Sequence, residues 1–252
     1  FRKRYHITWW QRLLWWMPCA GMVVYTCALA SIRSFAPSDL TWLNTYLFLL
    51  GMFVGPKAIF TLSSFVGWIV RKYITHTRRN WGHYFGLILG TIAFCVYVYG
   101  LTAGFSAIRV RHIDLSFNDL PPSFDGYRII HLSDLHLGTF DGWRKKILKA
   151  EMDSIGQQKP DLICFTGDLQ NMRPREVEKM LPVIRQAMRG TIAVLGNHDY
   201  TEYIKGNPKE KAAQEARLIA VEEKLLGWTL LRNQNIVITS SGGDSIYICG
   251  TE

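Results

Sequence analysis

The sequence predicts an α/β domain preceded by an α-helical transmembrane region, and three observations support this. Long uncharged apolar runs fill the first 108 residues, whereas short apolar runs alternate with amphipathic helical segments from residue 109 onward. The charge changes at the same place. Residues 1–108 hold ten Lys or Arg and one acid, and residues 109–252 hold nineteen of each sign. We therefore expect two domains, 1–108 and 109–252.

Two of the apolar runs are long enough to cross a bilayer. Leu13 to Ile32 and Tyr84 to Ile108 contain no charged residue, and about 20 apolar residues span a hydrocarbon core of about 30 Å as a helix. Tryptophans cluster at the start of the first run, where interfacial aromatic residues are enriched: Trp9, Trp10, Trp15 and Trp16. These runs predict an integral membrane protein whose partner is the lipid bilayer.

The middle run leaves the number of crossings open. Leu40 to Val70 is interrupted only by Lys57, and as one helix it would be about 46 Å long. Gly55 and Pro56 precede Lys57 and are turn formers, so a hairpin would give four crossings and place the loop 71–83 outside. Three crossings would keep this basic loop on the inside with the basic N-terminus, and would place residues 109–252 outside.

The charge pattern argues against two other classes of protein. The net charge of +9 comes from basic residues at the ends of apolar runs, not from a stripe on a polar domain, so no nucleic-acid partner is expected. A transporter would carry charged residues inside its spans, and only Lys57 qualifies.

The second half has the pattern of a sheet covered by helices. We expect a first strand at Val110 to Phe117 and further strands at the carboxyl side of turn-rich segments, with helices between them. The expected strands are Tyr127–Leu132, Asp161–Thr166, Thr191–Leu195, 228–231, 236–239 and 246–249, and the expected helices are Trp143–Gln157, Pro174–Met188 and 209–226. This β-α-β-α-β order predicts a parallel or mixed sheet.

Three of these strands are each followed by side chains that bind metal ions. The segments are Ser-Asp-Leu-His with Asp134 and His136, Thr-Gly-Asp-Leu with Asp168, and Gly-Asn-His-Asp with Asn197, His198 and Asp199. Ligands collect at the carboxyl ends of strands in open α/β sheets, so we expect the three segments to converge. Carboxylate, imidazole and amide oxygen together suit divalent transition ions.

In the order and spacing of these motifs, the sequence resembles the calcineurin-like metallophosphoesterases, and Leu120 to Gly138 is similar to the branch with membrane-anchored bacterial members. The resemblance implies a four-layer αββα sandwich, incomplete here, and two divalent metal ions such as Mn, Fe or Zn. It implies that Asp134 and His136 bind the first metal, that Asp168 bridges, and that Asn197 binds the second. It also implies that His198 is a catalytic acid or charge stabiliser, and that Asp199 orients its imidazole.

The chain departs from the family pattern after these motifs. The family pattern continues with a later His and a closing Gly-His-x-His, yet no histidine follows Asp199. We therefore expect a C-terminally truncated domain that by itself binds its second metal weakly and hydrolyses slowly at most. A natural pseudoenzyme is the alternative.

The predicted function is metal-dependent hydrolysis of a phosphomonoester, phosphodiester or pyrophosphate through attack of a metal-bridging hydroxide. Because the domain is tethered to a membrane, we expect a lipid-linked substrate, and the resemblance implies a bacterial inner membrane. The alternative is an inactive binding or signalling module on the same fold.

Overall fold

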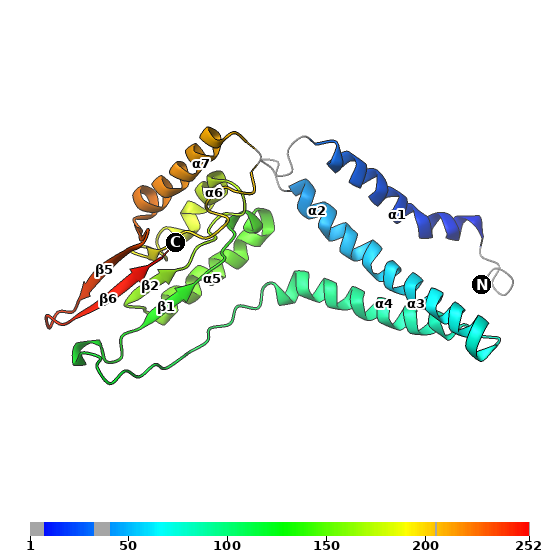
Figure 1. Cartoon of the computed structure of the whole chain (residues 1–252), viewed down its shortest axis with the longest axis horizontal. Coiled ribbons are helices and arrows are strands. Elements are labelled where there is room, and N and C mark those ends of the chain that lie inside the picture. Colours follow the sequence, from blue (N-terminus) through cyan, green and yellow to red (C-terminus); the bar gives the residue numbers. More distant parts are fainter. Residues whose placement is uncertain (1–7, 33–40, 205, 252) are drawn as a thin grey trace. The chain divides into compact units, whose positions relative to one another are not determined.

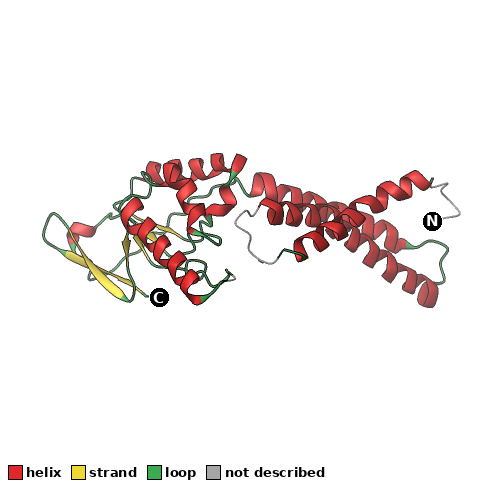
Figure 2. Cartoon of the chain, turned by 90° about the horizontal axis from the view of Figure 1, so that it is seen from above, coloured by secondary structure: helices red, strands yellow, loops and turns green. Residues whose placement is uncertain are grey.

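The computed structural model describes residues 8–32, 41–204 and 206–251. The chain divides into two compact units, one with the described residues up to Ile108 and the other with those from Arg109 onward (Figure 1). Figure 2 shows the first unit as helices and the second as strands with helices around them.

The first unit holds, among the described residues, three helices long and apolar enough to cross a membrane. The first is α1 (Trp9–Ala30) and the third joins α4 (Trp81–Tyr99) to a π-helical turn. The second runs without a break from Thr41 to Thr75 and comprises α2 (Thr41–Leu49), a π-helical turn (Leu50–Val54), α3 (Gly55–Val70) and a second π-helical turn (Arg71–Thr75).

The predicted turn at Gly55 and Pro56 is therefore wrong. The π-helical turn directly precedes Pro56, and the N–H of Gly55 donates to the carbonyl of Leu50, five residues back. A proline ring collides with the preceding turn of a regular α-helix, and a wider π-helical turn relieves this collision without ending the helix.

Glycines let α3 and α4 pack closely. A Cβ atom added to Gly82, Gly86 or Gly90 would overlap α3 at Ser63, Phe60 or Pro56. Small residues at a spacing of four allow helix backbones to approach in a membrane, where packing rather than the hydrophobic effect drives association.

The second unit contains a four-stranded parallel sheet in the order β1 (Ile129–Leu132), β2 (Leu162–Phe165), β3 (Ile192–Ala193) and β4 (Thr229–Leu230). Its connections contain α5 (Lys145–Gln158), α6 (Pro174–Ile184), and α7 (Pro208–Ala220) with a following π-helical turn. Each helix turns an apolar stripe inward; the buried residues include Leu148, Met152, Ile155, Val177, Met180, Ile184 and Leu218.

A two-stranded antiparallel sheet, β5 (Gln234–Thr239) and β6 (Ser245–Gly250), completes the described part of this unit. Ile236 and Ile248 pack against a buried cluster of Leu162, Ile192 and Leu231. The described part of the unit thus has two sheets with helices, as the metallophosphoesterase resemblance implies.

One strand prediction fails, and one predicted strand is more exposed than a core strand. Residues 109–121 form no strand among the described residues, and their alternating apolar side chains Ile113, Leu115 and Phe117 are exposed. Alternation alone does not make a strand when no neighbouring strand offers hydrogen bonds. The strand at 129–132 exists, but it lies at the edge of the sheet and is half exposed rather than buried.

Candidate metal centre

The loops after β1 and β2 are joined by backbone hydrogen bonds. The N–H of Asp134 donates to the carbonyl of Gly167 over 3.0 Å, and the N–H of His136 donates to the carbonyl of Asp168 over 3.0 Å. The third loop joins them through the N–H of His198, which donates to the carboxylate of Asp168 over 2.8 Å. All three motif loops therefore meet at the carboxyl ends of the parallel strands.

Three of the motif residues adopt a left-handed backbone. The φ angles are 56° at Asp134, 42° at His136 and 62° at Asp168. Such conformations cost of order 1–3 kcal/mol each in residues other than glycine, and they collect at functional sites. Here the three lie in adjacent loops and turn their side chains toward one another.

Two glycines make this approach possible. Gly167 has a φ of 90°, and a Cβ atom there would overlap the backbone of Gly196. A Cβ atom on Gly196 would overlap Asp168 in turn. Neither position has room for a side chain, so the sequence needs glycine at both.

Four side chains gather as a ligand set. The Nε2 atom of His136 lies 3.8 Å from Oδ1 of Asp134 and 3.8 Å from Oδ2 of Asp168. Ligand atoms of His136, Asp168 and His198 lie within 4.8 Å of one another. These separations are too long for hydrogen bonds but close to the spread of ligands around one ion, since bonds of about 2.1 Å allow up to about 4.2 Å between opposite ligands.

Each imidazole is held by a backbone carbonyl. Nδ1 of His136 lies 3.3 Å from the carbonyl oxygen of Gln170, and Nδ1 of His198 lies 2.6 Å from that of Asn171. A proton on Nδ1 leaves the Nε2 lone pair available, which is the usual arrangement of a metal-binding histidine. Two carboxylates and two imidazoles of this kind fit a divalent transition ion.

The role predicted for Asp199 is wrong in one respect, because His198 takes its orientation from Asn171 and not from this carboxylate. Asp199 is fully buried, with 0% exposure. Its carboxylate accepts backbone N–H groups from Asp168 at 2.7 Å, Gly196 at 2.9 Å, Leu169 at 3.1 Å and Gln170 at 3.4 Å. Asp199 thus fixes the loop that carries Asp168.

Burial raises the pKa of Asp199, while its backbone N–H partners lower it. A carboxylate can remain inside the protein only where such donors replace water. The buried charge and the surrounding N–H groups therefore stabilise the folded loop together.

Asn197 is exposed, and its amide donates to the hydroxyl of Tyr203 over 2.7 Å. The ring of Tyr203 in turn stacks on the imidazole of His198, with centroids 4.5 Å apart. The structure thus places Asn197 beside the ligand set, and its role as a metal ligand stays a prediction. Tyr203 was not predicted from the sequence, because it lies outside the three motifs.

Glu176 is a second supporting residue that the sequence analysis missed. Its carboxylate accepts the N–H groups of Asn171 at 2.7 Å, Met172 at 3.2 Å and Arg173 at 3.2 Å. This fixes the loop whose carbonyl holds His198. A Glu at the third position of a helix that opens with Pro174 is a recognisable capping signal, so the pattern could have revealed it.

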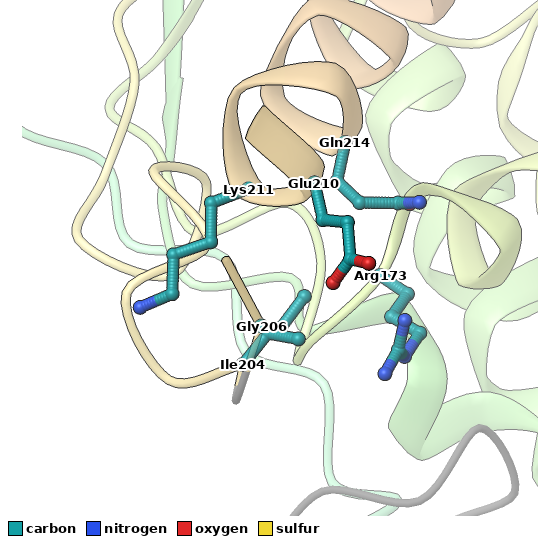
Figure 3. A pocket seen from close by; sticks show the side chains of 6 residues that line it. All are labelled: Arg173, Ile204, Gly206, Glu210, Lys211 and Gln214. Carbon is teal, nitrogen blue, oxygen red and sulfur yellow. The ribbon is translucent and has the colours of Figure 1, made fainter. Parts of the chain in front are cut away.

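A small pocket adjoins this loop (Figure 3). Arg173 at the start of α6 lines it opposite Lys211 and Gln214 of α7, and Ile204 and Glu210 complete its wall. Nε of Arg173 is buried and has no hydrogen-bond partner among the described residues. The pocket thus brings together the cations of Arg173 and Lys211 and the carboxylate of Glu210.

Two family models match the chain. Residues 127–248 match the calcineurin-like phosphoesterase model, and residues 1–105 match the model of a transmembrane domain described as that of a probable calcineurin-like phosphoesterase. The second match agrees with a transmembrane region in this segment, where the described residues form helices long and apolar enough to cross a membrane.

Similar proteins occur in bacteria and animals. The chain is 30% identical over 137 residues to the uncharacterized metallophosphoesterase YkuE of Bacillus subtilis, covering 53% of the chain and 43% of that protein. It is 32% identical to the transmembrane protein with metallophosphoesterase domain of Danio rerio, covering 41% of the chain and 24% of the relative. It is 35% identical to the UDP-2,3-diacylglucosamine pyrophosphatase LpxG of Chlamydia trachomatis, covering 38% of the chain and 30% of that protein.

The chain therefore spans less than half the length of each of these three relatives. The matched region includes the three loops that carry Asp134, His136, Asp168 and His198. With a phosphoesterase model over one part and its transmembrane model over the other, the chain belongs to the membrane-associated calcineurin-like metallophosphoesterases.

Proposed function

We propose that the protein is a membrane-anchored, metal-dependent hydrolase of phosphoesters, with a lipid-linked pyrophosphate or phosphodiester as its substrate. The observation that carries this proposal is the gathering of His136, Asp168 and His198 within 4.8 Å, with both Nδ1 atoms directed at backbone carbonyls. Divalent ions at such a site lower the pKa of water and neutralise charge on phosphoryl oxygens.

We assign the metal-binding role to Asp134, His136, Asp168 and Asn197, as the motif order implies. Asp168 is the bridging candidate because its carboxylate faces His136 on one side and the N–H of His198 on the other. A carboxylate between two ligand groups can serve two ions about 3.5–4 Å apart.

His198 is the candidate general acid. The carbonyl of Asn171 fixes its Nδ1, and Tyr203 stacks on one face of the ring, so its Nε2 has one direction in which to donate a proton. A positioned acid of this kind protonates the leaving oxygen and contributes typically 10²–10⁴-fold. Asp199 and Glu176 act as positioning residues, because each holds a loop that carries one of these groups.

The lipid-linked substrate class is supported by the membrane region and by the relative whose printed name is that of a UDP-2,3-diacylglucosamine pyrophosphatase. Arg173 supports it as well, because it lies two residues after Asn171, whose carbonyl holds His198, and a guanidinium there is a candidate partner for a second phosphate. On this proposal Arg173→Gln raises KM for a diphosphate substrate more than for a monoester.

We further propose that the α/β unit lies on the outer side of a bacterial inner membrane. Three crossings would leave the basic residues before α1 and the basic loop after α3 on one side, which the positive-inside rule assigns to the cytoplasm. Protease added to intact spheroplasts should then digest the α/β unit. Protection until the cells are lysed would place it inside.

The function is tested by metal loading followed by hydrolysis of a panel of monoesters, diesters and pyrophosphates. We expect turnover that requires Mn²⁺ or a similar ion, that chelation abolishes, and that His131→Ala leaves unchanged. His131 is a matched control because it lies in β1, five residues before His136, and bonds to Thr166 instead of the ligand set. Saturable metal binding without turnover on any substrate would support the inactive binding module instead.

A further inference from the structure

Lys57 is a charged residue within the longest apolar helix. The helix runs from Thr41 to Thr75, and Lys57 is its one charged residue before Arg71. An ionised side chain inside the hydrocarbon region is costly and normally faces a partner of opposite charge. A turn at Gly55 and Pro56 would have put Lys57 at the end of a helix, but the continuous helix removes that explanation.

The membrane helices offer this ammonium no carboxylate. Residues 8–32 and 41–104 contain neither Asp nor Glu. A second copy of the chain would bring the same helices and would therefore supply no acid at this depth either. Any neutralising anion must come from outside the membrane helices.

The contacts that Lys57 makes are dipolar. Its Nζ donates to the carbonyl of Trp15 over 2.5 Å, lies 3.7 Å from Sγ of Cys19, and sits 4.7 Å from the centre of the Trp15 ring. A carbonyl and an aromatic face solvate an ammonium but leave its unit charge in place. These contacts position the charge without neutralising it.

An apolar groove surrounds the ammonium. Residues of α1, α3 and α4 line it, and apart from Lys57 and Thr91 its walls are apolar side chains and glycines; they include Met52, Phe53, Phe60, Gly90 and Phe94. Gly90 packs directly against the backbone of Pro56, where a Cβ atom would collide with the carbonyl of Pro56. The lining of the groove thus has the chemistry to contact a hydrocarbon chain, with one cation beside it.

Lys57 contacts α1 close to the first residue of that helix. Trp15 is the seventh residue of α1, roughly 9 Å from its first residue at 1.5 Å per residue. Trp9, Trp10 and Arg12 lie in the first turns of that helix and mark the interface. A lysine side chain can extend several ångströms toward the interface, and a phosphate can move down to meet it.

We propose that Lys57 and this groove bind an anionic phospholipid, whose phosphate pairs with the ammonium while one acyl chain lies along the groove. This site is separate from the metal centre and does not depend on the proposed hydrolysis. The lipid phosphate would neutralise the Lys57 ammonium, for which the membrane helices supply no carboxylate.

The test compares binding of phosphatidylglycerol and phosphatidylcholine to the full chain by native mass spectrometry from mixed nanodiscs. We expect the protein to retain phosphatidylglycerol in preference. Lys57→Met should reduce the preference by about fivefold, the effect of one basic residue beside an anionic lipid. Lys57→Arg should keep it.

Lys72→Met is the matched control. Lys72 follows α3 in the same continuous helix and also lies over an aromatic ring, 5.0 Å from the centre of Trp68. Lys72→Met should leave the preference for phosphatidylglycerol unchanged. Equal losses in Lys57→Met and Lys72→Met would show only general attraction to anionic lipid and would overturn the site. An unchanged preference for phosphatidylglycerol in Lys57→Met would also overturn the proposed lipid site. A dimer whose second copy covers the groove, with no lipid retained, would overturn it as well.

Discussion

Each of the two units holds one site with uncompensated charge, and the two sites are of opposite sign. At the strand ends of the α/β unit, the carboxylates of Asp134 and Asp168 face each other across His136, whose Nε2 lies 3.8 Å from both. In the membrane unit, Lys57 faces only a carbonyl, a thiol and a ring. One site lacks positive charge and the other lacks negative charge.

This comparison teaches where to look for ligands. A folded chain neutralises most of its buried charges with its own groups, so a charge that the structure positions but leaves uncompensated marks a place for an external ion. The α/β unit adds strained backbone at the same place, with three left-handed non-glycine residues in two adjacent loops. Holding the carboxylates of the α/β site together therefore requires backbone strain in addition to uncompensated charge.

The largest expected effect comes from Asp168→Asn, which removes the central carboxylate of the α/β site. We expect the native protein to lose more than about 10³-fold in hydrolysis, beyond the 10–100-fold typical of a supporting residue. Rates are measured with saturating Mn²⁺. Asp141→Asn is the control, because Asp141 is an exposed acid paired with Lys179 at 2.9 Å; a similar loss in both variants would argue against a special role for Asp168.

His198→Ala should have a smaller effect that depends on the leaving group. A general acid matters for a poor leaving group, so we expect a 10²–10⁴-fold loss on alkyl phosphoesters and little loss on a p-nitrophenyl ester. The ratio of the two rates is the measurement. Equal losses on both esters would identify His198 as a metal ligand and not as the acid.

Asp199→Asn tests the positioning role of the buried carboxylate. An amide in this place would turn a donor toward backbone N–H groups that now donate to oxygen, so the loop of Asp168 should loosen. We expect a 10–100-fold weaker metal affinity with the ligands intact. Unchanged metal affinity would show that the loop holds its shape without this charge.

Some features of the fold and of the metal centre could be predicted from the sequence, and others could not. Helices, parallel strands and the convergence of Asp134, His136 and Asp168 follow from local patterns, because apolar periodicity and strand-end motifs are short-range signals. The partner of His198 could not be predicted, since a carbonyl such as that of Asn171 carries no side-chain signature. The turn assigned to Gly55 and Pro56 failed because a π-helical turn accommodates the proline.

The smallest effect concerns stability and pH. Glu222 is 1% exposed, one of its carboxyl oxygens has no hydrogen-bond partner among the described residues, and burial together with the charge of Asp199 raises its pKa well above the usual value. The folded state then binds more protons than the unfolded state once the pH exceeds about 4.5, so this group lowers stability as the pH rises toward its folded pKa.

Glu222→Gln removes that dependence. We expect the variant to unfold at a higher temperature than the parent at pH 7. The increase should be about 2–4 °C for each kcal/mol gained in the free energy of unfolding, and the two unfolding temperatures should differ little at pH 4. Thermal scans across this range provide the check. A variant that is less stable than the parent at pH 7 would show that Glu222 is charged and paired in the fold.

The most direct test of the central claim is calorimetric titration of Mn²⁺ into the full chain in nanodiscs, with Asp168→Asn and Asp141→Asn as matched variants. The metal centre predicts saturable binding in the parent and in Asp141→Asn, and its loss in Asp168→Asn. Binding that is equal in all three, or absent from the parent, would contradict a metal centre built from Asp134, His136, Asp168 and Asn197.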